Sequence, residues 1–554
     1  MTHPAEQSIG GLEPAAALRA TVQGRALPVG AERLVFYGLL ICSLIPVLAF
    51  EHLPIEDGPM HVANAAVYLY SEEAVFAEYY DFDLTPIPNL LADLVLAVMV
   101  TVMPPALALK LFGLFLAAGF PLAVRWCLKA LNPHMVWLGT LSIPLAQGRL
   151  FYFGLLNFLL GVVLAFFSVG IWLHYIRGRE RHNLRWVALA LMFAFVYLSH
   201  PLPFLALSLI IWASIVSDAL RASEQGEAFW RGLSRRLIPF LAVSAVPLGM
   251  LILVAGGEAS SVQYSSSFVE RIIYFPVHVV TGLTVYETPF AALSSFSIAL
   301  VAVMSVWKGR APVRSSPGFL IAVGVMVVIY FLGPDTIAYG GAVRMRVLMV
   351  ATAVGLLWLG CRTVPYWVRF AALAATAVVI LGLMGLRLPL LSQWNEDSAE
   401  YLSGSVVLEP GSTVLPLWVS DAGVRGPDGG RPLVLPLIEL AGSLTSSGLV
   451  VDLHHLPASL GAFPFRFAPG YDIRQTAGEG AGFEFQFGPE MVDIEQYEEQ
   501  GGARVDYVWL WGRSEADPAL SDSERAQRVL ALLETDFDLV FTSEEGHLEV
   551  YARR

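Results

Sequence analysis

About twelve apolar segments of roughly membrane-spanning length occupy the first 390 residues of this 554-residue chain. A helix needs about 20 mostly apolar residues to cross the hydrocarbon core of a bilayer. The segments lie at about 34–50, 89–103, 107–124, 135–147, 151–174, 186–199, 203–217, 237–255, 290–306, 318–332, 344–361 and 366–386. Beyond them such runs stop. The pattern predicts a polytopic α-helical membrane protein with about 11–13 transmembrane helices and a soluble C-terminal domain.

The amino-acid composition also indicates a membrane protein rather than a soluble one. Charged residues make up 15% of the chain and hydrophobic residues 56%, with a mean hydropathy of +0.62, whereas soluble proteins average about 25% charged residues. The net charge of −13 argues against a nucleic-acid partner, which requires basic surface. The cysteines, Cys42, Cys127 and Cys361, all lie in apolar segments, so the soluble domain has no disulfide framework or cysteine-based metal site.

The distribution of basic residues predicts the orientation of the chain, because short loops rich in lysine and arginine stay cytoplasmic. Four groups mark such loops: Arg177, Arg179, Arg181 and Arg185; Arg221, Arg231, Arg235 and Arg236; Lys308, Arg310 and Arg314; and Arg362 with Arg369. The loop at 51–88 contains acidic residues and no lysine or arginine. We therefore expect a cytoplasmic N-terminal tail at 1–33, a membrane domain at 34–390, an extracytoplasmic first loop at 51–88 and an extracytoplasmic domain at 391–554.

This orientation requires an odd number of crossings, whereas twelve segments give an even number. One segment between residues 89 and 147 is therefore too short to span or is re-entrant, or two spans have been counted as one. The segment 89–103 contains Asp93 and ends at Pro104-Pro105, and the segment 135–147 is interrupted by Pro144. The sequence alone leaves these alternatives open.

The soluble part alternates strand-like and helix-like stretches. Apolar, β-branched and aromatic residues predict strands at 411–420, 448–455, 504–512 and 537–543, and a final hairpin turning at Glu545-Gly546. Residues 521–534 have the pattern of an amphipathic helix with a Ser or Asp cap. We expect a small α/β domain. His454-His455 lacks partners at metal-ligand spacing and is predicted to be solvated surface.

The first loop places Glu56, Asp57 and His61 within about one helical turn, in the stretch "IEDGPMH". Gly58-Pro59 suits the first turn of a helix, and residues 61–70 fit a helix lying on the membrane surface. Asp57 and His61 are four residues apart and share a helix face. A carboxylate beside an imidazole suits a general base or part of a metal site. The alternative is that Asp57 only caps the helix, which is a common use of Asp.

Further polar groups fall at the predicted outer ends of the spans. Arg149 and Tyr152 lie near one such end, His200 lies at the outer end of a helical hairpin, and Arg344 and Arg346 begin a late span. Ionisable groups at membrane depth are costly and usually functional or paired. The arginines either snorkel to lipid headgroups or bind phosphate, since guanidinium groups match phosphate oxygens. For His200 a structural role at the helix end is the main alternative.

With these motifs in view, the chain resembles the GT-C class of membrane glycosyltransferases. A first span followed by an acidic outer loop, many short spans and an outer C-terminal domain are typical of that class. The chain is also similar to bacterial members in which "DGPMH", "GLLNFLLG", "LSHPLPFL" and an arginine-bearing late span occur in this order. The likeness covers about residues 34–386. The first loop departs from the paired-acid-plus-His spacing of the mannosyltransferase branch, which leaves the base and any metal requirement open.

The resemblance implies a function at the bacterial inner (plasma) membrane. The enzyme would move a hexosyl or pentosyl group from a polyprenyl-phosphate-linked donor to a lipid, glycan or protein acceptor in the cell envelope. Asp57 would be the general base, with Glu56 second and His61 nearby. Arg344 and Arg346 would hold the donor phosphate, and His200, Arg149 and Tyr152 would help to bind substrate. A divalent cation, Mg²⁺ or Mn²⁺, is an open expectation.

Two other classes share parts of this pattern. A transporter or flippase often carries inverted repeats and charges near the membrane midplane. This chain has no evident repeat, and most of its candidate charges lie near one membrane face, with Asp93 and Lys110 as exceptions. An inactive GT-C-like scaffold for polysaccharide assembly would keep the architecture and tolerate replacement of Asp57. Architecture alone does not separate these alternatives.

Overall fold

The computed structural model describes residues 29–82, 87–176, 183–255, 262–309, 316–337, 340–420, 432–460, 463–476, 488–513 and 523–554. The predicted tail up to residue 28 lies outside these ranges. So do Asp83 and the basic loop residues Arg177, Arg179, Arg181, Arg310 and Arg314.

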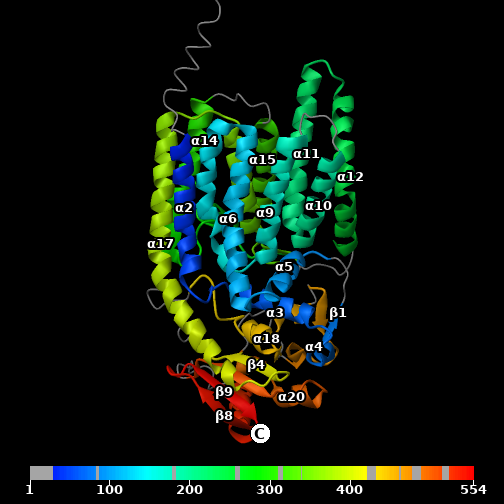
Figure 1. The fold of residues 1–554 in the computed structure, drawn as a ribbon, viewed down its shortest axis with the longest axis vertical. Coiled ribbons are helices and arrows are strands. Elements are labelled where there is room, and N and C mark those ends of the chain that lie inside the picture. Colours follow the sequence, from blue (N-terminus) through cyan, green and yellow to red (C-terminus); the bar gives the residue numbers. More distant parts are fainter. Residues whose placement is uncertain are drawn as a thin grey trace, which may run out of the picture.

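A bundle of long helices forms most of the described structure (Figure 1). Eight are long and apolar enough to cross a membrane: α2 (Val29–Ala49), α6 (Pro105–Leu131), α9 (Leu156–Ile171, continued by a π turn), α11 (Pro201–Glu224), α12 (Phe229–Ala255), α14 (Thr288–Trp307), α16 (Val343–Gly360) and α17 (Tyr366–Ser403). Two helices of 17 residues each, α10 (Asn183–Ser199) and α15 (Ser316–Leu332), run in the same bundle. The predicted polytopic helical architecture is confirmed.

The short segments between residues 89 and 147 explain the conflict in the number of crossings. Helix α5 (Leu91–Val100) has 10 residues and is about 15 Å long at 1.5 Å per residue, which is half of the hydrocarbon core. The stretch 133–154 behaves differently. It starts with the ten-residue 3₁₀ helix η1 (Pro133–Ser142), whose rise of about 2.0 Å per residue gives roughly 20 Å.

That stretch passes through the bundle to the end where the first loop lies. Gly139 packs against Arg125 near the C-terminus of α6, and the Tyr152 carbonyl accepts a hydrogen bond from the Glu56 amide. Together with α10, α15 and the eight long helices, eleven segments of the described chain run along the bundle, and eight of them are long and apolar enough to cross a membrane. This odd number agrees with α2 starting at the end of the bundle opposite to the C-terminal domain (Figure 1).

The C-terminal domain contains a five-stranded sheet of order β5-β4-β7-β9-β8. Its strands are β4 (Thr413–Trp418), β5 (Val451–Asp452), β7 (Tyr507–Trp511), β8 (Phe537–Thr542) and β9 (Leu548–Arg553). Strand β4 pairs in parallel with β5 and β7, whereas β9 pairs antiparallel with β7 and β8. The predicted strands, the amphipathic helix α21 (Glu524–Asp536) and the final hairpin at Glu545-Gly546 are all present.

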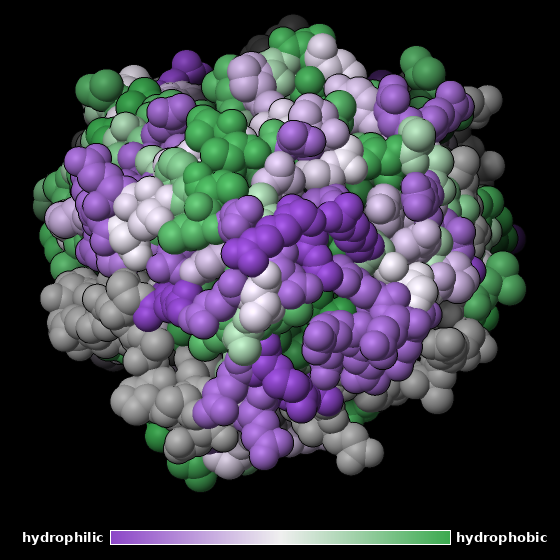
Figure 2. Space-filling view, turned by 90° about the horizontal axis from the view of Figure 1, so that it is seen from below, coloured by the Kyte–Doolittle hydropathy of each residue, from purple (hydrophilic) through white to green (hydrophobic). Residues whose placement is uncertain are grey.

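At its centre the sheet is buried on both faces, whereas most residues of the edge strand β8 are exposed or only partly buried. Alternate residues of β7 pack into two separate apolar cores, Val508 and Leu510 into one, Trp509 and Trp511 into the other. Tyr401, near the end of α17, packs against both tryptophans. The end of the molecule formed by this domain presents mainly hydrophilic residues to solvent (Figure 2).

The first loop is part of the same body. Strand β1 (Tyr80–Phe82) pairs antiparallel with β6 (Phe465–Phe467). Helix α3 (Gly58–Leu69) lies between α5 on one side and α18 (Gly442–Gly448) on the other, and residues 58–67 are all buried. The predicted helix therefore exists, and the C-terminal domain covers the side of it that faces away from α5.

Candidate active site

Asp57 occupies the N-cap position of α3, and backbone hydrogen bonds fix its place. The amide of Glu56 donates to the Tyr152 carbonyl (2.9 Å) and the amide of Asp57 donates to the Phe153 carbonyl (3.1 Å). Gly154 closes this contact with a φ of 77°, and a Cβ there would lie 2.7 Å from the Asp57 nitrogen. Only glycine adopts this conformation readily and allows so close an approach. The turn at 152–154 therefore positions the carboxylate.

The Asp57 side chain is not used as a cap. It forms no capping hydrogen bond with α3, so the alternative that Asp57 only caps this helix is not borne out. Its side chain is half-buried within an otherwise buried segment. Burial raises the pKa of Asp57 to about 6, although the nearby charges of His61 and Arg346 oppose this shift. A carboxylate with such a pKa accepts a proton near neutral pH more readily than an ordinary one.

Arg346 is the arginine whose positive charge lowers the pKa of Asp57. Its Nη1 lies 2.7 Å from Nε2 of His200, and its guanidinium lies 5.5 Å from the centroid of the Phe158 ring. His200 is the N-cap of α11, with Nδ1 3.1 Å from the Leu202 nitrogen. Within the described residues Arg346 forms no ion pair, and its Nε has no hydrogen-bond partner. A buried arginine with unused donors is suited to bind an anion.

Arg344 has different partners, although it lies two residues away on α16. Such a spacing directs two side chains to different sides of a helix. Nε of Arg344 donates to Asp335 (2.5 Å), and its Nη2 contacts both Asp335 and the Ser266 hydroxyl. Arg271 also donates to Asp335 (3.3 Å). Burial opposes ionisation of Asp335, but hydrogen bonds from Ser266 and Arg344 outweigh it and lower its pKa. The charge of Arg344 is thus compensated.

Glu56 and Arg149 contact the C-terminal domain. Oε2 of Glu56 accepts the Leu435 amide (2.9 Å), and Nη2 of Arg149 donates to the Leu433 carbonyl (3.2 Å). Tyr152 is buried, with its ring 5.2 Å from the Arg387 guanidinium. Two of these three predicted site residues, Glu56 and Arg149, therefore hold the segment 433–435, and the third contacts Arg387.

His61 belongs to a buried hydrogen-bond network rather than pairing directly with Asp57. Its Nδ1 donates to Asp93 (2.6 Å), and Asn64 donates to the other oxygen of the same carboxylate (3.0 Å). Burial disfavours the imidazolium, but the charges of Asp93 and Asp57 outweigh it and raise the pKa of His61. His455 donates to Asn64 (2.9 Å) and accepts from Tyr80 (3.1 Å). The network joins α5, α3, the first loop and the C-terminal domain.

The prediction that His454 and His455 are solvated surface is wrong. Both are buried, 3% and 2% exposed, and Arg474 donates to His454. Local sequence does not reveal this burial, because Asn64 and Tyr80, which bind His455, lie 391 and 375 positions away.

Glu439 is a site residue that sequence reasoning missed. It is 4% exposed, and within the described residues its Oε1 has no hydrogen-bond partner. Burial and the negative charges of Asp57, Asp452 and Glu56 raise its pKa well above the usual range, although Arg474 opposes this. The one available signal was a lone glutamate in the apolar stretch "LVLPLIELAG". The C-terminal domain therefore brings a second carboxyl group close to Asp57.

Among the described residues, the side chains closest to a metal-ligand arrangement lie elsewhere. Glu400, Glu545 and His547 form that group, at the far side of the C-terminal domain from the first loop. Glu56, Asp57 and His61 do not converge as ligands, since Glu56 binds a backbone amide and His61 binds Asp93.

We expect the network through Asn64 to stabilise the junction of the two domains. Asn64→Ala leaves buried groups of Asp93 and His455 unsatisfied, which costs about 1–3 kcal/mol. Thermal unfolding of purified protein in detergent should show a lower midpoint. Gln225→Ala, at an exposed helix end, is the control and should behave as wild type. Equal midpoints for both variants would show that the network is energetically unimportant.

Comparison with known proteins places the fold. No family model and no curated protein matches the chain. Two solved structures of ArnT from Cupriavidus metallidurans are similar to it. The form bound to undecaprenyl phosphate has a TM-score of 0.53 at 11% identity, over 95% of this chain and 98% of that one. The apo form has a TM-score of 0.51 at 11% identity, over 97% and 98%. The chain thus shares the fold of ArnT over 95% or more of its length, in agreement with the fold that the sequence resemblance implied.

Proposed function

We propose that this protein is a membrane glycosyltransferase that moves a sugar from a polyprenyl-phosphate-linked donor to an acceptor outside the cytoplasm. The observation that carries the proposal is that Asp57, a half-buried carboxylate, lies within electrostatic range of Arg346, a buried arginine without an ion pair in the described chain. They lie where the helix bundle meets the C-terminal domain. The fold shared with ArnT bound to undecaprenyl phosphate supports a lipid-linked phosphate as the ligand.

In the proposed reaction, the carboxylate of Asp57 takes the proton from an acceptor hydroxyl. The hydroxyl oxygen forms a bond to the anomeric carbon of the donor sugar, and the bond between that carbon and the phosphate oxygen breaks. The polyprenyl phosphate leaves with the electron pair, and Arg346 stabilises the charge that develops on it. His200 positions Arg346, and Asp93 positions His61, whose charge favours the ionised form of Asp57.

In this proposal the other predicted residues hold parts of the site in place. Glu56 and Arg149 fasten the segment 433–435 over the site, and the Tyr152 carbonyl holds the backbone before Asp57. Glu439 lies on the acceptor side, because it comes from the soluble domain. The protein would work at the inner (plasma) membrane, with its N-terminus cytoplasmic and the site outside.

The test is transfer by the purified full-length protein in liposomes. A panel of radiolabelled polyprenyl-phosphate hexoses and pentoses serves as donors, membrane extract provides acceptors, and nucleotide sugars are the control donors. We expect labelled product from one lipid-linked sugar and none from nucleotide sugars, with and without added Mg²⁺ or Mn²⁺. Movement of a labelled lipid across the liposome membrane, with no transfer to any acceptor, would contradict the proposal and favour a flippase.

The pKa of Asp57 predicts the pH dependence of this transfer. A base must be deprotonated to act, and its pKa is raised to about 6. We therefore expect kcat/KM to be constant above this pH and to fall about tenfold for each pH unit below it. Initial rates from pH 4.5 to 8 measure this. A profile without a break between pH 5 and 7 would rule out titration of Asp57 as the limiting group.

A further inference from the structure

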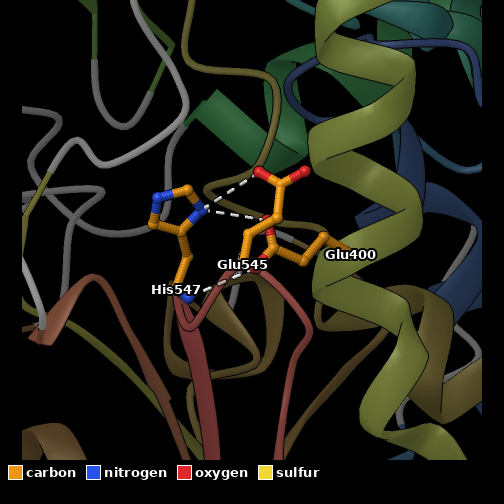
Figure 3. A group of neighbouring side chains, drawn as sticks. All are labelled: Glu400, Glu545 and His547. Atoms are coloured by element: carbon orange, nitrogen blue, oxygen red, sulfur yellow. Dashed lines mark hydrogen bonds and ion pairs between the residues drawn. The ribbon is translucent and has the colours of Figure 1, made fainter.

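The C-terminal end of α17 meets the β8–β9 turn at a cluster of ionisable side chains. Glu400 comes from the helix, Glu545 from the turn and His547 from the residue before β9 (Figure 3). One ligand atom from each of the three lies within 4.8 Å of the others. Gly546, with a φ of 79°, makes the turn tight enough to bring residues 545 and 547 to the same side.

The distances in this cluster fit a small cation. Nδ1 of His547 lies 2.9 Å from Oε2 of Glu400 and 4.0 Å from Oε2 of Glu545. Zinc binds nitrogen and carboxylate oxygen at about 2.0–2.2 Å in tetrahedral geometry, which places neighbouring ligand atoms roughly 3.4 Å apart. The two observed separations fall on either side of that value, so small side-chain rotations suffice to form the site.

Supporting hydrogen bonds already orient the ligands. Oε1 of Glu400 accepts from the Ser543 hydroxyl (2.5 Å) and from the His547 amide (3.2 Å). Its other oxygen is thereby directed at the imidazole. The Ser543 hydroxyl in turn accepts the Leu548 amide (3.0 Å). Such outer partners are typical of protein metal sites, where they fix the ligating atoms.

A fourth group gives independent evidence for a cation. Asp397 lies one turn before Glu400 on α17 and is 7% exposed, and its Oδ2 has no hydrogen-bond partner within the described chain. Its electrostatic neighbours include Glu400, His547 and Glu545. A buried carboxylate without a partner is costly. The carboxylates of Glu400 and Glu545 carry more negative charge than a single imidazolium balances, whereas a divalent cation balances it.

We propose that Glu400, Glu545 and His547, with Asp397 beside them, bind a divalent transition-metal cation. Imidazole with carboxylates suits Zn²⁺ or Mn²⁺, whereas Mg²⁺ prefers oxygen ligands only. The ion would join the end of α17 to the terminal hairpin and so fix the sheet on the membrane helix. This inference is independent of the proposed sugar transfer, because the cluster lies apart from Asp57.

The test uses the full chain, purified in detergent without a polyhistidine tag, treated with a chelator and then titrated with ZnCl₂ or MgCl₂. We expect about one equivalent of Zn²⁺ to bind and to raise the midpoint of thermal unfolding, since a ligand that binds only the folded state stabilises it. Mg²⁺ should have no such effect. Absence of Zn²⁺ binding would overturn the proposal and leave a hydrogen-bonded ion pair only.

Glu545→Gln is the informative variant. The Glu545 side chain is 70% exposed and its loss should not unfold the protein, so the metal-free midpoint should equal that of wild type. We expect its affinity for Zn²⁺ to fall at least about tenfold, by analogy with other losses around metal ligands. Glu544→Gln removes the same charge from the exposed neighbouring residue and should bind as wild type. Equal affinities for both variants would show that the metal binds elsewhere.

Discussion

Replacement of Asp57 by Asn should lower kcat for sugar transfer by about 10²–10⁴, the range over which a positioned general base contributes. The amide is nearly isosteric with the carboxylate but cannot accept the hydroxyl proton. The turn formed by Phe153 and Gly154 holds the backbone of residue 57, so the fold should remain. The measurement is steady-state transfer from the active lipid-linked donor, with KM for that donor nearly unchanged.

Glu72→Gln is the matched control for this experiment. It removes one negative charge from the same loop at an exposed position and should leave kcat unchanged. Asp57→Asn with wild-type activity would exclude Asp57 as the base and would direct attention to Glu439, the other carboxyl group at the junction. A lower thermal midpoint for Asp57→Asn alone would mean that activity was lost through unfolding.

The second large effect concerns Arg346. Arg346→Gln should lower kcat by about 10²–10³, as the loss of one donor to a developing negative charge does in other enzymes. Arg346→Lys should fall between this variant and wild type, because lysine keeps the charge but loses the planar pair of donors that matches phosphate. Binding of polyprenyl phosphate should weaken in the same order, which titration of the purified variants would measure.

Arg344→Gln separates phosphate binding from structure. Arg344 is already bound by Asp335 and Ser266, so its loss should lower the unfolding midpoint and change kcat little. If Arg344→Gln lowered kcat as strongly as Arg346→Gln at an unchanged midpoint, both arginines would hold the phosphate and our assignment of a single one would be wrong.

The sequence predicted the helical membrane architecture because long apolar runs have few other solutions. It did not resolve the crossings between residues 89 and 147, since apolar content alone does not distinguish α5, which is too short to span, from the extended η1 segment that passes through. The strands of the C-terminal domain and its hairpin followed from local patterns. The burial of α3 did not, because α18, which covers it, lies about 380 residues later in the chain.

The candidate site shows the same limit. Asp57, Arg346 and His200 were identified because each stands out locally in an apolar setting. The bond between Asn64 and His455 joins residues 391 positions apart, and no spacing in the sequence reveals such a pair. For the same reason Glu439 was missed and His454-His455 was placed on the surface. This part of the site forms only when segments that are distant in the sequence pack together, and residue type alone does not reveal it.

The pairing of β1 with β6 has a consequence for biosynthesis. Phe82 is opposite Phe465, which the ribosome adds 383 residues later. At about 5–20 residues per second this delay is roughly 20–80 s. During that time the first loop has emerged without the strand and the helix that cover it, and Glu439 has yet to be made. The candidate site is therefore completed only after the last membrane helix has been made, so a nascent chain with a partly built bundle lacks it.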